Sequence, residues 1–274
     1  MAKENTVSIL GCGWLGLPVA ENLIHAGWQV NGSTTTPEKL ALLNNSGIHS
    51  FLINLAAPTA AQDLVPFLNA DYLIISFPPR LRSGNEQNYH NEIQLLRTAI
   101  SSSGVRFILF ISSTGVYPDL NKIITEAEEL TPYVVGNRLL QAEEAIFSIP
   151  GKSSTILRFG GLVGGTRHPG CFLAGKQQVA NPDAPVNLIH LQDCVAIISQ
   201  IFQQHKWGNI YNACADEHPS REAFYTRAAQ QLQVAPPQFA APAGNETYKI
   251  ISSEKLKIDL QYHFIYPDPL LFVY

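Results

Sequence analysis

The sequence has little of what marks several common classes of protein. Lys and Arg number 18 against 22 Asp and Glu, so the net charge is −4 and no basic excess favours a nucleic-acid or anionic-membrane partner. Charged residues make up only 15% of the chain while hydrophobic residues make up 46%, a balance typical of ordered globular proteins. No apolar run approaches the roughly 20 residues that span a bilayer. The composition therefore predicts a folded chain that acts on neither nucleic acid nor membrane.

Cysteine is also scarce, and its spacing excludes common uses. The four cysteines lie far apart without a C-x-x-C pair, so we expect reduced thiols and no disulfide or zinc site. His, Asp and Glu show no metal-ligand spacing either. The first six residues, MAKENT, contain no apolar segment of the kind found in signal peptides. We therefore expect a cytoplasmic protein without a bound metal.

The first half of the chain alternates short β-rich runs with helical patterns. Such alternation predicts βαβ units and a parallel sheet covered on both faces, that is, an α/β fold with a doubly wound Rossmann sheet. The strands are expected at Val7–Leu10, Gln29–Ser33, Ser50–Ile53, Tyr72–Ser76, Phe107–Ile111 and Ser154–Arg158. The helices are expected at Leu15–Ala26, Pro37–Asn45 and Glu86–Ser102.

After Arg158 the pattern changes to a loop-rich section with paired glycines. A strand–helix unit over 187–202, a strand at Asn209–Asn212, a helix from about Ser220 to Gln233 and a helix-like turn at Ser252–Leu260 follow. We predict a Rossmann domain over 1–158 and a small C-terminal substrate lobe made mostly of 159–274. The strand–helix segment 187–212 is expected to return to the first domain.

The stretch VSILGCGWLG, from Val7 to Gly16, ends an apolar run in three glycines spaced G-x-G-x-x-G. In a dinucleotide-binding turn the first glycine allows the tight turn, the second lets the pyrophosphate approach the backbone, and the third lets helix and strand pack closely. The phosphates then lie at the helix N-terminus, where its dipole favours them. A plain turn is the alternative, but a predicted strand precedes this loop and a predicted helix follows it. The predicted cofactor contacts are Gly11, Cys12, Gly13, Trp14, Leu15 and Gly16.

The end of the second expected strand bears on which dinucleotide is bound. A site that prefers NAD carries Asp or Glu there for the ribose 2′-hydroxyl. Here Ser33, Thr34 and Thr35 occupy the position, with Lys39 one turn further on. Hydroxyls can accept a 2′-phosphate and do not repel it, so we predict NADP in preference to NAD. The alternative is that the segment serves as a helix cap, with Thr36 before Pro37.

Motifs spread over nearly the whole chain form an ordered set. They are the glycine loop, FILFISSTGVYPD (Phe107–Asp119), ILRFGGLVGGTRHPG (Ile156–Gly170), NLIHLQDCV (Asn187–Val195) and NIYNACADEHPSREAFY (Asn209–Tyr225). In this order they resemble the extended short-chain dehydrogenase/reductase superfamily, and more narrowly the NAD-dependent epimerase/dehydratase family. The resemblance implies an NAD(P)-binding Rossmann domain, assigned here to 1–158, and a substrate-binding lobe.

The resemblance also implies a catalytic hydroxyl. In the family, the strand ending SS…VY carries a Ser or Thr that hydrogen-bonds the reacting hydroxyl or carbonyl. The matching position is Ser113, with Thr114 beside it. Strand carboxyl ends line ligand crevices in such sheets, which favours this role. The alternative is a local turn in which the side chain satisfies loop amides.

Further cofactor contacts follow from the resemblance. Asn54 and Leu55 occupy the place after the third strand where the family usually has Asp near the adenine. Phe77, Pro78 and Pro79 follow the fourth strand, where the backbone passes the ribose and pyrophosphate.

The sequence departs from the family at the general base, the Tyr of Tyr-x-x-x-Lys. Aligning Gly136 and Glu143 places Val135 in the tyrosine position and Leu139 in the lysine position. Tyr133, two positions earlier, is the candidate substitute for the proton relay. The missing pair makes the chain an atypical member and leaves the reaction open.

The sequence supports two hypotheses for the function and disfavours a third. The first is an NAD(P)-dependent oxidoreductase, epimerase or dehydratase that binds a small polar substrate through Arg158, Arg167 and His168. The second is a non-catalytic dinucleotide sensor or regulatory protein, which the missing Tyr-Lys pair favours. The N-terminal third also resembles the β-hydroxyacid dehydrogenases, but their all-helical C-terminal domain does not fit this proline-rich second half. The expected partner is a small molecule, and a homodimer is left open.

Overall fold

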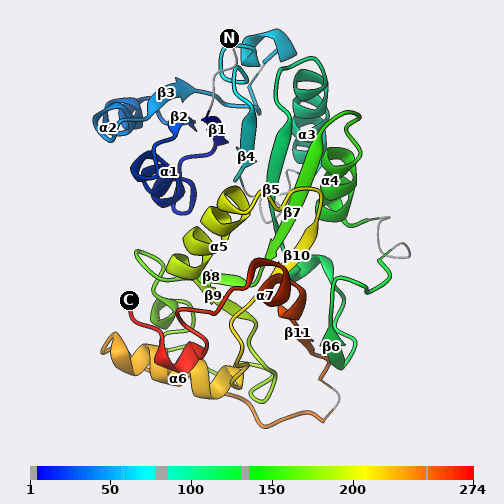
Figure 1. The fold of residues 1–274 in the computed structure, drawn as a ribbon. Coiled ribbons are helices and arrows are strands. Elements are labelled where there is room, and N and C mark those ends of the chain that lie inside the picture. The colour runs from blue at the N-terminus through cyan, green and yellow to red at the C-terminus, as the bar shows by residue number, and fades with distance from the viewer. Residues whose placement is uncertain (1–4, 58, 78–85, 131–135, 245) are drawn as a thin grey trace. The chain divides into compact units, whose positions relative to one another are not determined.

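A seven-stranded sheet organises the chain (Figure 1). The computed structural model describes residues 5–57, 59–77, 86–130, 136–244 and 246–274. The strand order is β10-β7-β5-β4-β1-β2-β3, and β1 pairs in parallel with β2 and β4, as β2 does with β3 and β4 with β5. The strands are β1 (Thr6–Leu10), β2 (Gln29–Thr34), β3 (His49–Leu52), β4 (Tyr72–Ile75), β5 (Phe107–Ser113), β7 (Ser153–Phe159) and β10 (Ile210–Ala213).

The order of these strands creates a switch point. The chain runs outward from β1 through β2 to β3, then returns to β4 on the other side of β1 and continues to β5. Right-handed crossovers in opposite directions place helices on opposite faces of such a sheet. In such sheets ligands generally bind at the carboxyl ends of the strands where the order reverses. In this chain the order reverses between β1 and β4. The predicted doubly wound parallel fold is confirmed.

Apolar spacing explains which helix faces are buried. In α1, Val19, Ala20 and Leu23 are buried, and they follow the three- and four-residue spacing of one helix face. The helices α3 and α4 pack against each other beside β4 and β5 (Figure 1). The helices are α1 (Gly16–His25), α2 (Leu40–Asn45), α3 (Glu86–Ser101), α4 (Arg138–Phe147), α5 (Leu191–Gln203), α6 (Arg221–Gln231) and α7 (Glu254–Leu260).

The expected elements are present with shifted ends. The helix expected at Pro37–Asn45 is divided into a 3₁₀ turn, Pro37–Lys39, and the short helix α2. The helix expected from Ser220 begins at Arg221, because the Ser220 hydroxyl accepts a hydrogen bond from the Ala223 amide and so caps α6.

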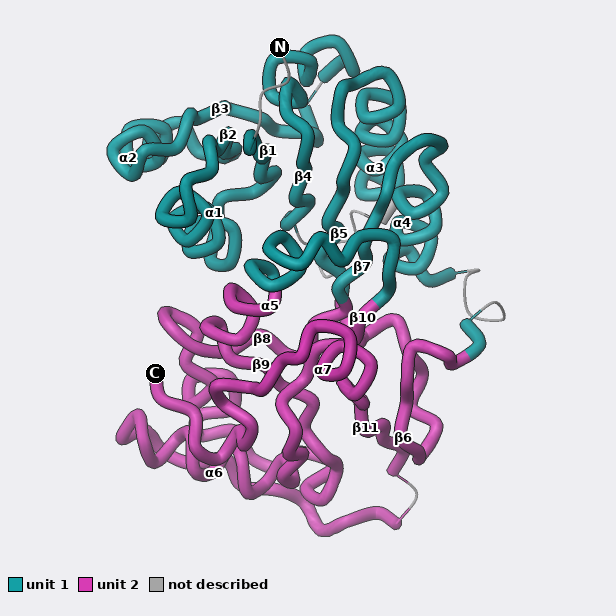
Figure 2. Tube along the Cα trace, in the orientation of Figure 1, with its two compact units in different colours: residues 1–112, 129–157, 198–210 teal, residues 113–128, 158–197, 211–274 magenta. Residues whose placement is uncertain are grey.

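The chain divides into two compact units (Figure 2). The first unit comprises 1–112, 129–157 and 198–210, and the second comprises 113–128, 158–197 and 211–274. The second unit also contains two parallel strand pairs, β6 (Lys122–Ile124) with β11 (Lys249–Ile251), and β8 (Gly161–Val163) with β9 (Leu188–His190). The sequence pattern predicts neither β6 nor β11, because three residues are too few to show a period.

Candidate functional site

The turn between β1 and α1 is tied to the end of β2. The Cys12 amide donates to the Ser33 carbonyl at 2.8 Å, and the Gly11 amide donates to the Ser33 hydroxyl at 2.9 Å. Gly11 has φ of 102°, a backbone conformation that favours glycine. The strand β2 therefore fixes the path of the glycine loop.

The three glycines of this turn differ in what surrounds them. A Cβ on Gly16 would lie 2.1 Å from the Gly11 carbonyl oxygen, so only glycine lets α1 start this close to β1. A Cβ on Gly11 would lie 3.0 Å from the carbonyl oxygen of Ser76, the residue after β4. A Cβ on Gly13 would meet nothing within 4 Å, and Gly13 is exposed. The space that a Cβ on Gly13 would enter is therefore open.

The other loop residues differ in burial. Cys12 is buried, and burial raises the pKa of its thiol to about 12. Its sulfur lies against Gly32, where a Cβ would approach it to 2.6 Å. Cys12 is therefore a neutral thiol packed beneath the loop, while Trp14 is half-buried and Leu15 is buried.

The residues predicted to contact a 2′-phosphate differ in burial. Ser33 is buried with its oxygen accepting from the Gly11 amide, and the buried Thr34 hydroxyl accepts from the Thr36 amide. Thr35 and Lys39 are exposed. The exposed pair is thus the part of this segment that is open to a ligand.

The residues predicted around the adenine and ribose are placed only in part. Asn54 is exposed, and its side-chain oxygen accepts from the Ala56 amide, while Leu55 is half-buried. Phe77 packs edge-on against Tyr89 with ring centroids 5.7 Å apart. Pro78 and Pro79 lie outside the described residues.

Ser113 and Thr114 follow one another at the carboxyl end of β5. The Ser113 hydroxyl oxygen accepts from the Gly115 amide at 3.1 Å, which is the local turn considered above. A hydroxyl can donate one hydrogen bond and accept two, so the Ser113 hydroxyl can accept from Gly115 and also donate its hydrogen to another group. Thr114 is buried, and Tyr133 lies outside the described residues.

The helix α4 begins at Arg138, after the segment in which the family's general base was expected. Asn137 caps α4 by accepting from the amides of Leu139 and Leu140, and Gly136 has φ of 88°. Leu139, in the lysine position, is 7% exposed and packs in the core. One turn further on, the buried Glu143 accepts a hydrogen bond from Ser112 at 2.5 Å. The aliphatic side chain of Leu139 is therefore buried near the start of α4, and its match to the lysine of the family stays a prediction.

The three predicted substrate contacts all lie in the second unit. Arg158 is 4% exposed, donates from Nη1 to the Tyr117 hydroxyl at 2.6 Å and lies over the ring. His168 accepts at Nδ1 from the Gly170 amide and packs at a tilt against Tyr274, with ring centroids 4.2 Å apart. Arg167 is exposed. Their contact with a substrate stays a prediction.

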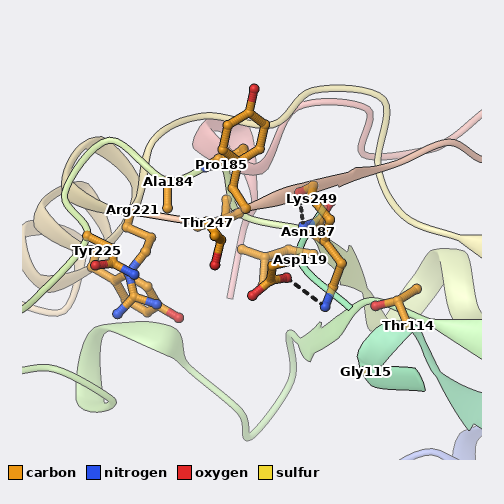
Figure 3. A pocket seen from close by; sticks show the side chains of 14 residues that line it. Thr114, Gly115, Asp119, Ala184, Pro185, Asn187, Arg221, Tyr225, Thr247 and Lys249 are labelled. Carbon is orange, nitrogen blue, oxygen red and sulfur yellow. Dashed lines mark hydrogen bonds and ion pairs between the residues drawn. The ribbon is translucent and has the colours of Figure 1, made fainter. Parts of the chain in front are cut away.

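A cavity of about 320 Å³ lies in the second unit (Figure 3). In this view Arg221 and Tyr225 lie on one side, and Asp119 and Lys249 lie on the other. The Lys249 ammonium contacts Asp119 at 2.9 Å and donates to the Tyr117 carbonyl at 2.7 Å. Thr114 also lines the cavity, which links it to the end of β5.

Thr114 is identified from the sequence as a candidate site residue, but the charged residues of this cavity are not. Asp119, Arg221 and Lys249 come from segments about 100 and 30 residues apart along the chain. Arg221 follows an N-cap and Lys249 follows a proline-rich stretch, and neither position carries a functional spacing. No sequence signal separates them from ordinary surface charges.

Within the described ranges, no cluster of three His, Cys, Asp or Glu side chains is arranged to hold a metal ion. No helix in that part of the chain is long and apolar enough to cross a membrane.

Burial of histidines predicts acid destabilisation. Burial lowers the pKa of His168, His190 and His218. The Nδ1 atoms of His168 and His190 accept from the amides of Gly170 and Gln192, which fixes neutral tautomers. Between the folded pKa and about 6.5 the unfolded chain binds more protons than the folded chain, so the free energy of unfolding must fall as pH falls through this window.

Urea denaturation at a series of pH values measures this slope. In His168→Asn the amide oxygen can still accept from Gly170 without titrating, so we expect a smaller pH slope below about pH 6.5. The control is His205→Asn at an exposed turn, which should keep the wild-type slope. Equal slopes in wild type and His168→Asn would contradict the account.

Comparisons with known proteins give one close relative and several similar folds. Protein YeeZ of Escherichia coli is 38% identical over 270 residues, which covers 97% of each chain. A Methylobacillus flagellatus structure named for the NAD-dependent epimerase/dehydratases is 24% identical, with a TM-score of 0.73 over 96% of this chain and 94% of the other. An Agrobacterium tumefaciens short-chain dehydrogenase/reductase superfamily protein with bound NAD is 20% identical, with a TM-score of 0.74 over 97% and 94%. No family model matches the chain. The two structures show that the fold is that of the superfamily suggested by the motifs.

Proposed function

This chain belongs to the family of protein YeeZ, and we propose that it is an NAD(P)-dependent oxidoreductase, epimerase or dehydratase acting on a small polar substrate. The observation that carries the proposal is the open space above Gly13 at the switch point between β1 and β4. Packing within the described residues does not require a glycine there, because a Cβ on Gly13 would meet no heavy atom within 4 Å. A pyrophosphate passing over the backbone supplies the reason.

The residues of the first unit fit a dinucleotide. Gly11, Gly13 and the start of α1 would hold the pyrophosphate, and Phe77 would lie beside the ribose. The exposed Thr35 and Lys39 would face a 2′-phosphate. When bound, the nicotinamide supplies or accepts a hydride.

Ser113 has the chemistry to orient a reacting oxygen. Because its oxygen already accepts from Gly115, its hydrogen is the group that would donate to a substrate carbonyl or hydroxyl. His168 is the candidate acid, since Nδ1 accepts from Gly170 and the neutral ring carries its proton on Nε2. Tyr133 stays the other candidate for the proton relay.

One observation favours a non-catalytic dinucleotide-binding protein as the second candidate. Leu139 is buried at the lysine position, so the family's usual means of lowering a tyrosine pKa is missing there. Incubation of NADPH with small carbonyl compounds distinguishes the two. Oxidation that is lost in Ser113→Ala supports the enzyme, whereas tight binding without oxidation supports the sensor.

The proposal is tested by titrating the protein with NADPH and NADH and following nicotinamide fluorescence. We expect both to bind and NADPH to bind more tightly. In Lys39→Ala the NADPH affinity should fall by about two- to tenfold while the NADH affinity is unchanged. If neither cofactor binds, reduced or oxidised, both candidate functions fail.

A further inference from the structure

We infer that Arg221 binds a carboxylate or phosphoryl group of a small substrate in the cavity of the second unit. The inference deepens the proposed function, because only that function makes the bound anion a substrate. Binding of the anion itself depends only on residues of the second unit.

The first support is the state of the Arg221 side chain. Its Nε atom is buried, and among the described residues it has no hydrogen-bond partner. None of the ion pairs in that part of the chain includes Arg221. A buried donor without a partner costs about 1–3 kcal/mol, so a ligand that accepts from it regains that free energy on binding.

The second support is that the position of Arg221 is fixed. Its amide donates to the Ala184 carbonyl at 2.9 Å, and Ser220 caps the helix that it begins. The guanidinium lies over the Tyr225 ring, with its central carbon 5.9 Å from the centroid. Figure 3 shows the two side chains together at one side of the cavity. A planar cation held in this way is suited to bidentate binding of a carboxylate or phosphate.

The third support is the charge balance of the cavity. Lys249 is held at 2.9 Å from Asp119, so these two lining charges compensate one another. The remaining charge among the lining residues is the guanidinium of Arg221. The cavity therefore carries one uncompensated positive charge, which matches a single anionic group.

The size of the cavity limits the ligand. A volume of about 320 Å³ lies at the lower end of the roughly 300–1,000 Å³ range of small-molecule pockets. The hydroxyl groups of Thr114 and Thr247 line it, and they can bind polar atoms of the ligand. The geometry thus favours a compact anion with hydroxyl or carbonyl groups over a nucleoside diphosphate.

Calorimetric titrations with inorganic phosphate, malonate and uridine diphosphate at constant ionic strength test the inference. In Arg221→Gln the affinity for phosphate or malonate should fall about ten- to hundredfold. The matched control is Arg227→Gln, an exposed arginine on the same helix, which should keep the wild-type affinity. Comparing phosphate with malonate shows which anion the cavity prefers.

A second variant should change affinity in the opposite direction, which a loss of folding cannot do. Asp119→Asn removes the carboxylate that compensates Lys249, so anion affinity should rise roughly threefold or more. The inference is overturned if wild type binds neither small anion, if Arg221→Gln binds as wild type does, or if uridine diphosphate binds more than tenfold tighter than phosphate. NADPH affinity, measured in parallel, should be unchanged in Arg221→Gln. Loss of cofactor binding in wild type with the anion results intact would remove the proposed function alone.

Discussion

Replacing Asp193 with alanine is expected to lower the free energy of unfolding by about 3–5 kcal/mol. Asp193, in the first turn of α5, is fully buried. Its carboxylate accepts from the Tyr262 hydroxyl at 2.7 Å and from the amides of Ile265 and Tyr266 at 2.7 and 3.1 Å. Alanine would leave these three donors, one buried and two partly buried, without their acceptor. Because whole domains are stable by about 5–15 kcal/mol, this loss is a large share of the total.

Urea denaturation of wild type and variants measures the effect. Asp193→Asn keeps an acceptor oxygen and the side-chain shape, so it should lose less than the alanine variant. Asp268→Ala is the control, because Asp268 also accepts from an amide, that of Leu270, but in a less buried place. A loss below about 1 kcal/mol in Asp193→Ala would show that the carboxylate does not hold the 262–266 segment.

Replacing Gly16 with alanine is expected to destabilise the protein and to abolish cofactor binding. The new Cβ would lie 2.1 Å from the Gly11 carbonyl oxygen, which is a backbone atom that cannot rotate away. Relief requires α1 to move away from β1, at a cost of about 1–3 kcal/mol. The same movement displaces the amides that would hold the pyrophosphate.

Thermal unfolding and NADPH titration of the same sample separate the two effects. The control is Gly104→Ala, in which the new Cβ meets nothing within 4 Å, and both properties should stay as in wild type. Wild-type stability in Gly16→Ala would contradict the packing that the structure shows. Wild-type cofactor affinity would contradict the proposed role of the turn.

Repeating patterns in the sequence predict the central sheet well. The strand Tyr72–Ile75 is apolar throughout and Phe107–Ser113 is apolar over its first five residues, because neighbours cover both faces, and such runs are typical of parallel strands. The close packing at Gly16 also follows from the glycine spacing alone. Local sequence is sufficient for these features because each depends on residues only a few positions apart.

The cavity could not be predicted in this way. Lys249 is placed by the pairing of β11 with β6 and by Asn187, whose side-chain amide donates to the Lys249 carbonyl at 2.9 Å. Arg221 is placed by the loop that contains Ala184. These contacts join segments far apart in the chain, and β6 and β11 are too short to show a pattern. The contact of Ser33 likewise could not be predicted, because its hydroxyl accepts from the Gly11 amide and so joins β2 to the turn after β1.

The central claim is that a dinucleotide passes over Gly13, and NADPH titration of Gly13→Val beside Gly104→Val tests it most directly. Both glycines are exposed and have open space where a Cβ would lie, so neither change should shift the melting temperature. The account predicts that NADPH affinity falls at least about tenfold in Gly13→Val and is unchanged in Gly104→Val. Equal affinity in Gly13→Val and wild type, or no binding to wild type, would contradict it.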